Sequence, residues 1–319
     1  MSNDFQTLLQ KFFIDRLINQ RRVSPCTINS YRDTFRIMLR FINEEKGIRA
    51  NAINIEMLTA EMIIEFMNYL ERTRNNKNKT INNRLAAINA FMDYVVYERP
   101  EYSGIAVRIK GIPYRNIEKN NVCYMTKQEI ESILKSCDNE CFLGRRDTVI
   151  ILLLYNTGMR VSELTTVRNQ DLSLENQTCA TLRIMGKGRK ERVVPLWEKT
   201  RKWLLKYLSE TSCNENNYIF KSPGVDHLTR SGVRYRINEV VKKAGLKCPS
   251  LTKKTITPHV FRHSTAMHLL QAGIDLSTIA IWLGHENMDT THKYMVADLA
   301  LKEMAVSYTH LTLPTKRIV

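Results

Sequence analysis

The sequence has no long apolar run and no cysteine pair at metal-binding spacing. Its longest apolar run, Val149 to Tyr155, is far too short to span a bilayer. The seven cysteines are scattered and include no C-x-x-C pair, which fits reduced thiols better than disulfides or a zinc site. The first residues lack a basic segment followed by an apolar stretch, so we expect no secretory signal and a cytoplasmic location.

Acidic residues are scarce beside basic ones. The 319 residues include 48 Lys and Arg against 32 Asp and Glu, which gives a formal net charge of +16 and a pI near 9.6. Such a balance favours a polyanionic partner, most often nucleic acid. A membrane surface is the weaker alternative, because no long basic amphipathic helix stands apart from the core pattern. A merely basic protein is the plainest alternative.

Helical periodicity dominates the first hundred or so residues. Ser24-Pro25 offers an N-cap followed by proline at the first helical position, and apolar residues then recur at helical spacing up to Ile42. Two further helices are expected after Thr59 and after the basic turn at residues 73–79. Beside the first apolar stripe, basic residues repeat at intervals of four and can face either DNA phosphates or solvent: Arg32, Arg36 and Arg40.

Breaks in this pattern divide the chain. Prolines and glycines punctuate a stretch rich in Arg, Lys and Asn after the helical part, so we expect a helical domain over residues 1–110 and a linker over 111–122. A second domain is expected over 123–306. The residues after Ser307 look extended, and we predict a disordered tail over 307–319.

The second domain is predicted to mix helices with a small β-sheet. Two short strands, Thr181 to Met185 and Glu191 to Pro195, flank a turn that carries Lys187 between two glycines. Lys187 can reach a phosphate or can be an ordinary exposed turn lysine, and the glycines do not form a P-loop. The chain as a whole is therefore expected to be mainly α with a small β-sheet, an α+β fold.

Three polar residues share one face of a predicted helix. His259, Arg262 and His263 lie three and four positions apart. The two histidines have the spacing of a zinc-binding helix, but Val260 stands where a zinc protease has its glutamate, so no metal site is predicted. A partly buried polar face without chemistry is the alternative.

An arginine and a tyrosine complete the candidates. Arg160 follows Gly158 closely enough to be held by the turn and aimed at an anion, or it can form a structural ion pair with Glu163. Tyr294 closes a run that begins at Leu283. A tyrosine that shares a site with histidines and an arginine suggests an activated phenol that attacks an anion, whereas a tyrosine alone is more often a core or surface aromatic.

Taken together, these segments resemble the tyrosine recombinase, or phage integrase, family. The resemblance extends from about Ser24 to Met295 and rests on motifs that occur in one order with family-like spacing: Thr157–Leu164, Gly186–Gly188, His259–His263, Leu283–His285 and Thr291–Tyr294. It implies that the first domain is a helical core-binding domain and that the second is a mixed α/β catalytic domain.

The resemblance also implies roles for the matching residues. Tyr294 would attack a DNA phosphodiester and form a 3′-phosphotyrosyl link. Arg160 and Arg262 would hold the non-bridging oxygens of the scissile phosphate. Lys187 would protonate the departing 5′ oxygen.

Further residues would support this chemistry. His259 would assist proton transfer, His285 would add a hydrogen bond, and Glu163 would fix Arg160 or a histidine. Other basic residues are expected to contact DNA: Arg32, Arg36, Arg40, Arg189, Lys190, Arg230 and Arg234.

The residue types suit such a reaction. A free phenol has a pKa of about 10 and needs help to act as a nucleophile at neutral pH, which nearby cations provide. Arginines match the charge that spreads over phosphoryl oxygens in the transition state. The covalent link retains the energy of the broken bond, so neither ATP nor a cofactor is expected. Guanidinium and imidazole groups neutralise charge, so no divalent metal is expected either.

A site-specific DNA recombinase is thus the predicted function. By resemblance it would work on double-stranded DNA as a tetramer on two sites, in the nucleoid and away from membranes, with accessory DNA-bending proteins as further candidate partners. Mobile-element integration or excision is favoured over chromosome-dimer resolution, on the extra basic linker alone. The alternatives are a type IB topoisomerase-like enzyme that nicks and reseals one duplex, and a non-catalytic DNA-binding accessory factor.

Overall fold

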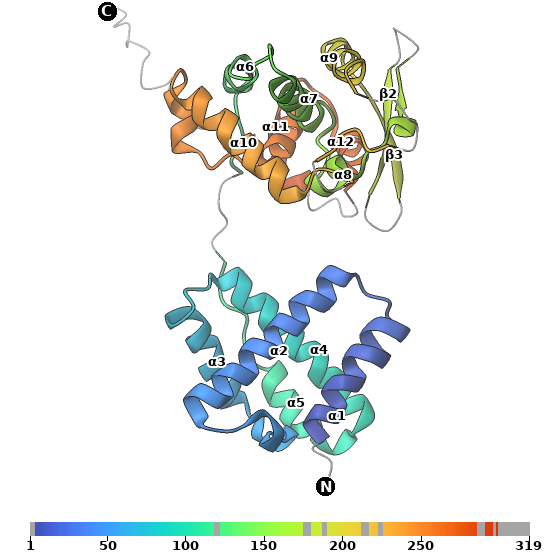
Figure 1. Cartoon of the computed structure of the whole chain (residues 1–319). Coiled ribbons are helices and arrows are strands. Elements are labelled where there is room, and N and C mark those ends of the chain that lie inside the picture. Colours follow the sequence, from blue (N-terminus) through green and yellow to red (C-terminus); the bar gives the residue numbers. More distant parts are fainter. Residues whose placement is uncertain are drawn as a thin grey trace, which may run out of the picture. The chain divides into compact units, whose positions relative to one another are not determined.

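The computed structural model divides into two compact units, Met1–Lys119 and Asn120–Val319. It describes residues 4–117, 122–174, 180–186, 190–211, 217–222, 226–285, 291–295 and 298. Its described part is mostly helical, with a small sheet confined to the second unit (Figure 1). This is the expected α+β class. None of the described helices is long and apolar enough to cross a membrane.

The first unit is a bundle of helices. Its α-helices and a π-helical segment that continues the first of them, η1, are α1 (Asp4–Lys11), η1 (Phe12–Gln20), α2 (Pro25–Lys46), α3 (Ala60–Arg72), α4 (Asn78–Glu98) and α5 (Ser103–Lys110). Short 3-10 turns lie at Ala50–Ala52, Ile55–Met57 and Pro100–Tyr102. The three helices expected from the sequence are α2, α3 and α4, and α1 with η1 and α5 complete the bundle.

Local signals explain where these helices begin. The Ser24 side chain accepts a hydrogen bond from the Thr27 backbone N–H, and Pro25 occupies the first turn of α2, as predicted. Thr59 caps α3 in the same way through the backbone N–H of Met62. The core is rich in aromatic rings that meet edge to face, among them Phe12, Phe35 and Phe91. The bundle therefore has a core of its own.

Residues beyond α5 remain attached to the first unit. The backbone N–H of Arg115 donates to the Asn82 side chain, which in turn donates to the Arg115 carbonyl. The Arg115 guanidinium also reaches Glu71 at 2.7 Å and Asn68 at 2.9 Å. The predicted linker began at residue 111, whereas the chain is held on the bundle at least as far as Arg115.

The second unit is mostly helical, with a three-stranded sheet at one side (Figure 1). In chain order the elements are α6 (Lys127–Lys135), α7 (Phe142–Thr157), α8 (Val161–Thr166), β1 (Leu172–Ser173), β2 (Thr181–Met185), β3 (Glu191–Pro195), α9 (Glu198–Leu208), α10 (Arg230–Gly245), α11 (Pro258–Gln271) and α12 (Leu276–Leu283). Two 3-10 turns lie at Asn169–Asp171 and Pro249–Lys253. The sheet is antiparallel in the order β1-β2-β3, with Met185 opposite Glu191 beside the hairpin. Both predicted strands are confirmed with the bounds expected.

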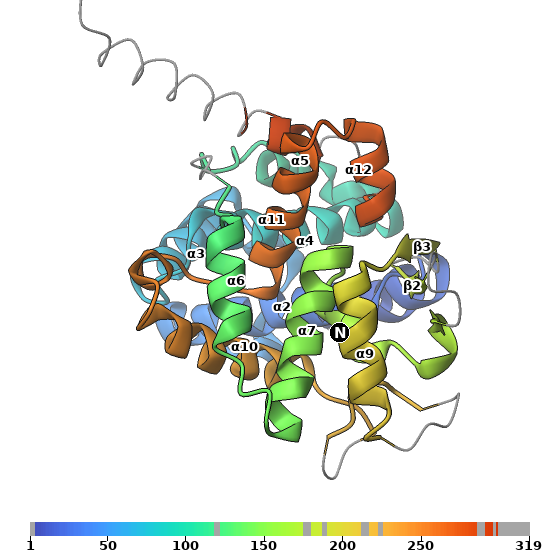
Figure 2. The same ribbon diagram turned by 90° about the horizontal axis from the view of Figure 1, so that it is seen from above.

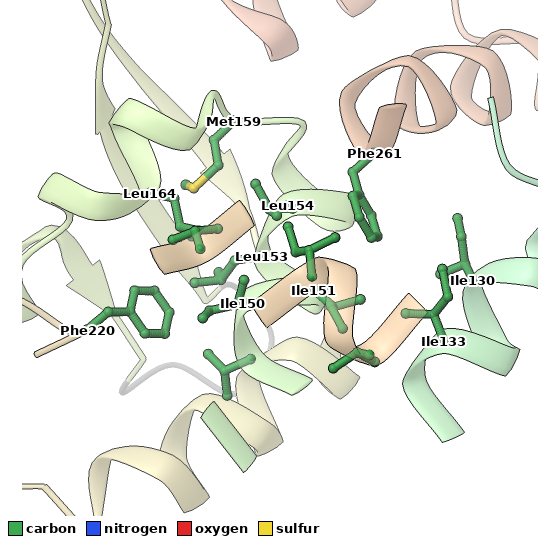
Figure 3. Packing of buried hydrophobic residues seen from close by; sticks show 14 of the residues in the cluster. Ile130, Ile133, Ile150, Ile151, Leu153, Leu154, Met159, Leu164, Phe220 and Phe261 are labelled. Carbon is green, nitrogen blue, oxygen red and sulfur yellow. The ribbon is translucent and has the colours of Figure 1, made fainter. Parts of the chain in front are cut away.

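Helix α7 is the centre of the second unit. It packs against α9 and α11 (Figure 2), and most of its residues are buried. Its Ile150, Ile151, Leu153 and Leu154 meet apolar side chains from several other elements (Figure 3). A helix that is apolar on nearly every side is expected at such a position. Because α7 is held on all sides, the turn that follows it is held in place as well.

That turn depends on Gly158, which ends α7 in the left-handed region with φ +60°. Its N–H donates to the Leu154 carbonyl and closes the helix. The glycines predicted to end α11 and α12 also have positive φ, at +84° for Gly273 and +65° for Gly284. A Cβ on Gly158 would overlap Leu283 Cδ2, whereas one on Gly273 would meet nothing within 4 Å.

Gly158→Ala and Gly273→Ala separate backbone strain from packing. Strain alone costs about 1–3 kcal/mol for a non-glycine residue in this region. We expect Gly273→Ala to lower the free energy of unfolding by that amount and Gly158→Ala to lower it further, because the added methyl group also displaces Leu283. Urea unfolding followed by circular dichroism measures both. Equal losses would show that the contact with Leu283 is unimportant.

Candidate active site

Four segments of the second unit bring the candidate residues together. Arg160 lies between α7 and α8, and His259, Arg262 and His263 lie on the first turns of α11. His285 follows α12. Tyr294 lies in the helical segment 291–295. The first turn of α11 is started by Pro258, which has no N–H to leave unpaired at that position.

A buried carboxylate joins two arginines at one side of the site. Glu163 Oε1 accepts from Arg160 Nη1 at 2.8 Å, and Glu163 Oε2 accepts from Arg192 Nη2 at 2.7 Å. The backbone N–H of Arg160 also donates to Glu163 Oε2. The ion pair considered from the sequence is therefore present, and Arg192 of β3 is its unforeseen third member.

Burial and pairing act on Glu163 in opposite directions. The side chain is only 5% exposed, and burial by itself raises the pKa of its carboxyl. Hydrogen bonds and charge from Arg192, followed by hydrogen bonds from Arg160, outweigh burial and bring the pKa below its usual value. Glu163 is therefore ionised at neutral pH and holds both guanidinium groups in fixed directions.

Arg262 is buried with hydrogen-bonding capacity left over. It is 4% exposed, and its Nη1 donates to the Gly158 carbonyl at 2.8 Å. Its Nη2 is buried and has no hydrogen-bond partner among the described residues. Burial first, and then the charge of Arg160, lower its pKa to about 10, so it stays cationic at neutral pH. A buried cationic donor without an acceptor is costly, which makes this a favourable place for an anion.

Tyr294 lies against two histidines that come from different elements. It is 2% exposed, and its Oη is 2.9 Å from His263 Nδ1. The His285 ring stacks on the tyrosine ring, with centroids 6.2 Å apart and planes at 16°. His285 Nδ1 is also within hydrogen-bonding distance of Thr291 Oγ1, at 2.8 Å. The phenol oxygen thus meets His263, and the ring face meets His285.

The same surroundings determine which of these groups carries a proton. Burial raises the pKa of the Tyr294 phenol, while the charges of Arg262 and Arg160 oppose that rise. Burial first, and then neighbouring positive charges, lower the pKa of His263 and of His285 to about 4. His259 is exposed by comparison, but partial desolvation and Arg262 still lower its pKa. At neutral pH the phenol is protonated and the imidazoles are neutral.

Not all predicted residues can be placed. Lys187 and Arg189 lie outside the described residues, as does the predicted tail at 307–319. Within the described ranges, no group of three or more His, Cys, Asp or Glu is placed to hold a metal ion.

The remaining predicted DNA contacts are exposed side chains in both units. Three of them lie on α2, one directly precedes β3 and two lie on α10: Arg32, Arg36, Arg40, Lys190, Arg230 and Arg234. Arg36 pairs with Asp33 at 3.1 Å, but both side chains are largely exposed, so the pair is weak. Arg234 is close enough to His259 to lower its pKa, which brings α10 near the site.

Arg192 and His263 are the residues to which the sequence alone gave no role. Arg192 alternates with Val194 on the inner face of β3, and an arginine on the buried face of a strand is a signal that the pattern contained. Arg192 Nε also donates to the Trp282 carbonyl at 3.1 Å, which joins β3 to α12. The sequence places His263 only on a polar helix face, because its contact with Tyr294 spans 31 residues.

Family models match both units of the chain. Residues 123–300 match the phage integrase family, and residues 11–99 match the phage integrase N-terminal SAM-like domain. The chain belongs to the phage integrase family, whose members are also called tyrosine recombinases. It is a site-specific tyrosine recombinase with a SAM-like domain followed by an integrase catalytic domain.

Individual relatives span most of the chain. It is 39% identical over 302 residues to the "Putative integrase/recombinase y4rC" of Sinorhizobium fredii, covering 95% of this chain and 90% of that protein. It is 30% identical over 291 residues to the tyrosine recombinase XerC of Staphylococcus aureus, covering 90% and 91%.

Solved structures share the fold. The XerH recombinase in a post-cleavage complex with a palindromic difH substrate matches with a TM-score of 0.71 at 24% identity, over 90% of this chain and 81% of that one. The Tn1549 transposon integrase in complex with transposon right-end DNA matches with a TM-score of 0.68 at 18% identity, over 93% and 98%.

Arg192→Met tests how far the site depends on the buried pair. Removing one partner of a buried ion pair leaves the other charge without full pairing, which costs about 3–5 kcal/mol. Because Glu163 keeps its pair with Arg160, we expect the variant to lose about 2–4 kcal/mol in the free energy of unfolding. The control is Arg183→Met on β2. Arg183 pairs with Asp171 at 3.2 Å, but its side chain is 45% exposed. That variant should lose less than about 1 kcal/mol. Equal losses in urea unfolding would contradict the assigned importance of Arg192.

Acid should weaken the folded protein through His263 and His285. Their pKa values are about 4 when folded, against 6.5 ordinarily, so between those values the unfolded chain binds protons that the folded chain does not. Their effect is absent above pH 6.5, and stability falls as the pH drops toward 4. We expect the thermal midpoint to fall between about pH 7 and about pH 5, and to fall less in a His263→Asn/His285→Asn double variant. If the thermal midpoint of that variant falls as much as in wild type, other groups cause the effect.

Proposed function

We propose that Tyr294 is the nucleophile that cuts DNA through a 3′-phosphotyrosyl intermediate. The observation that carries this is a buried phenol close enough to Arg262 and Arg160 to feel their charge, together with an Arg262 N–H that is buried and has no partner among the described residues. The +16 net charge favours DNA as the partner. In the attack, Tyr294 Oη bonds to phosphorus, and the bond from phosphorus to the 5′ oxygen breaks.

The other residues take roles that their positions permit. Arg160 and Arg262 neutralise the phosphoryl oxygens, and Glu163 keeps Arg160 in its direction through the 2.8 Å pair. Lys187 protonates the departing 5′ oxygen. His259 and His285 assist around the phosphate. The positive charge at the phosphate comes from the guanidinium groups, so the reaction requires no divalent metal, and the covalent link retains the energy of the broken bond, so it requires no ATP.

We further propose that a tetramer acts on two double-stranded sites and that the protein serves a mobile element. The higher identity to y4rC than to XerC supports the integrase side of the family. In this proposal, the core-binding domain (residues 1–110) and the catalytic domain (residues 123–306) both bind the DNA. Arg32, Arg36 and Arg40 contact the duplex from the first, and Arg189, Lys190, Arg230 and Arg234 contact it from the second.

Covalent capture of DNA tests the chemistry and identifies the DNA target in the same experiment. Sheared genomic DNA from the source cells is incubated with the protein in EDTA, stopped with SDS, and freed of unbound DNA. We expect an SDS-resistant adduct in wild type and none in Tyr294→Phe, since phenylalanine has no oxygen nucleophile. Tyr207→Phe is the matched control, because Tyr207 is also 2% exposed but lies in the core.

The outcomes separate the alternatives. Loss of the adduct in EDTA would indicate a metal mechanism, and an adduct in Tyr294→Phe would remove Tyr294 as nucleophile. Sequencing the captured ends decides the biological role: ends of a mobile element support the proposal, whereas one recurring chromosomal site supports dimer resolution. Capture without sequence preference, together with relaxation of any supercoiled plasmid, would support a type IB topoisomerase-like enzyme.

A further inference from the structure

The one hydrogen bond of the Tyr294 oxygen within the described part of the chain goes to His263. Tyr294 Oη and His263 Nδ1 are 2.9 Å apart, and their rings are tilted with centroids 5.7 Å apart. His263 lies on α11 directly after Arg262, so the helix that supplies a phosphate-facing arginine also supplies this contact. None of the roles assigned above uses His263.

The protonation states of the two groups permit a proton to pass from the phenol to the imidazole. Burial keeps the phenol protonated, and burial, His259, Arg262 and Lys293 keep the imidazole neutral. We assign Oη as the donor and Nδ1 as the acceptor, which puts the ring hydrogen on Nε2. Nδ1 is therefore placed to take the phenolic proton.

We propose that His263 is a catalytic residue, the general base that accepts the proton of Tyr294 Oη during the attack on DNA. The proposal rests on the function proposed above. As the bond from Oη to phosphorus forms, the Oη–H bond breaks and the proton moves to Nδ1. The bond from phosphorus to the 5′ oxygen breaks, and that oxygen takes a proton from Lys187. In resealing, the 5′ hydroxyl returns its proton to Lys187 and attacks phosphorus, the bond from phosphorus to Oη breaks, and His263 returns the proton to Oη.

The two other histidines are less suited to this step. His285 stacks on the face of the tyrosine ring, and its Nδ1 is engaged with Thr291. His259 is exposed and lies one turn before His263 on α11. Only His263 has a ring nitrogen at hydrogen-bonding distance from the oxygen that reacts, among the described residues.

Substrate binding would strengthen this base. The charged and titratable groups that face His263 are His259 and Arg262 from α11, Lys293 and Tyr294 from the 291–295 segment, and His285. A bound phosphate offsets the positive charges among them and so favours a proton on the imidazole. His263 would thus remain a poor base in free protein and become a better one with DNA in place.

Single-turnover cleavage tests the proposal. The probe is a duplex oligonucleotide that carries the sequence recovered by covalent capture. His263→Asn keeps an acceptor oxygen near the Nδ1 position but cannot take a proton, and His263→Ala removes both capacities. We expect each to slow adduct formation by about 10²–10⁴-fold. His263→Asn should also lose the limb of the pH profile on which the wild-type rate rises with pH.

The chain offers a matched control on the same helix. His268 Nδ1 lies 2.7 Å from Tyr155 Oη, which is a second histidine–tyrosine pair away from the proposed nucleophile. His268→Asn should cleave within a few-fold of wild type. Wild-type rates in folded His263→Asn would overturn the proposal, and circular dichroism establishes folding. If His263→Ala does not fold, His263→Asn decides.

A sulfur substitution separates base from acid. In a duplex with a 5′-bridging phosphorothiolate, the leaving group is a thiolate, which is far less basic than an alkoxide and departs without protonation. This substrate should restore cleavage by Lys187→Ala and leave both His263 variants slow. Restoration in the His263 variants would assign His263 to the leaving group and overturn the proposal.

A measurement without DNA keeps the two proposals distinguishable. Imidazole ¹⁵N NMR at about pH 7 should show Nδ1 of His263 unprotonated, with a shift that changes in Tyr294→Phe; a protonated Nδ1 would overturn the proposal. If wild type forms no adduct on any DNA, the proposed function fails. If wild type forms a Tyr294-dependent adduct and His263→Asn matches its rate, only the role of His263 fails.

Discussion

The arrangement of the site depends on one buried carboxylate that holds two arginines. Glu163 bridges Arg160 and Arg192 at 2.8 and 2.7 Å, and Arg192 also reaches the Trp282 carbonyl. Because charge is costly to bury unless it is fully paired, these groups have little freedom to move separately. One ion-pair network thus connects the turn after α7, the hairpin strand β3 and the end of α12. Arg160 is held in place before any substrate arrives.

A second constraint is the burial of Tyr294, His263 and His285. Desolvation raises the pKa of the Tyr294 phenol and lowers those of His263 and His285. Each group is therefore neutral in the free protein, while Arg262 retains a buried N–H that has no acceptor among the residues the structure describes. The positive charge at the site is thus mainly on arginines, whose pKa is high enough to survive burial. Such a site favours an anion, and Tyr294 is protonated in the free protein.

Much of the fold followed from local signals. The Ser24-Pro25 start of α2, the capping box at Thr126 and Glu129, and the left-handed glycines at the helix ends were readable because each acts within a few residues. The strand pair was readable from its length and turn. The end of the first unit was harder to predict from the sequence, because the attachment of Arg115 to Asn82 joins residues that are 33 apart in the sequence. Attachments of that kind leave no periodic pattern.

The sequence by itself determined the family, the residue types of the site and their order along the chain. Those are properties of short motifs, and Arg160, His259, Arg262, His285 and Tyr294 could be named from them. The tertiary structure decided which of those residues touch. It placed Arg192 against Glu163 and His263 against the Tyr294 oxygen, across 29 and 31 residues. Hydrogen bonds at such separations depend on how helices pack around α7, and packing is a property of the whole unit.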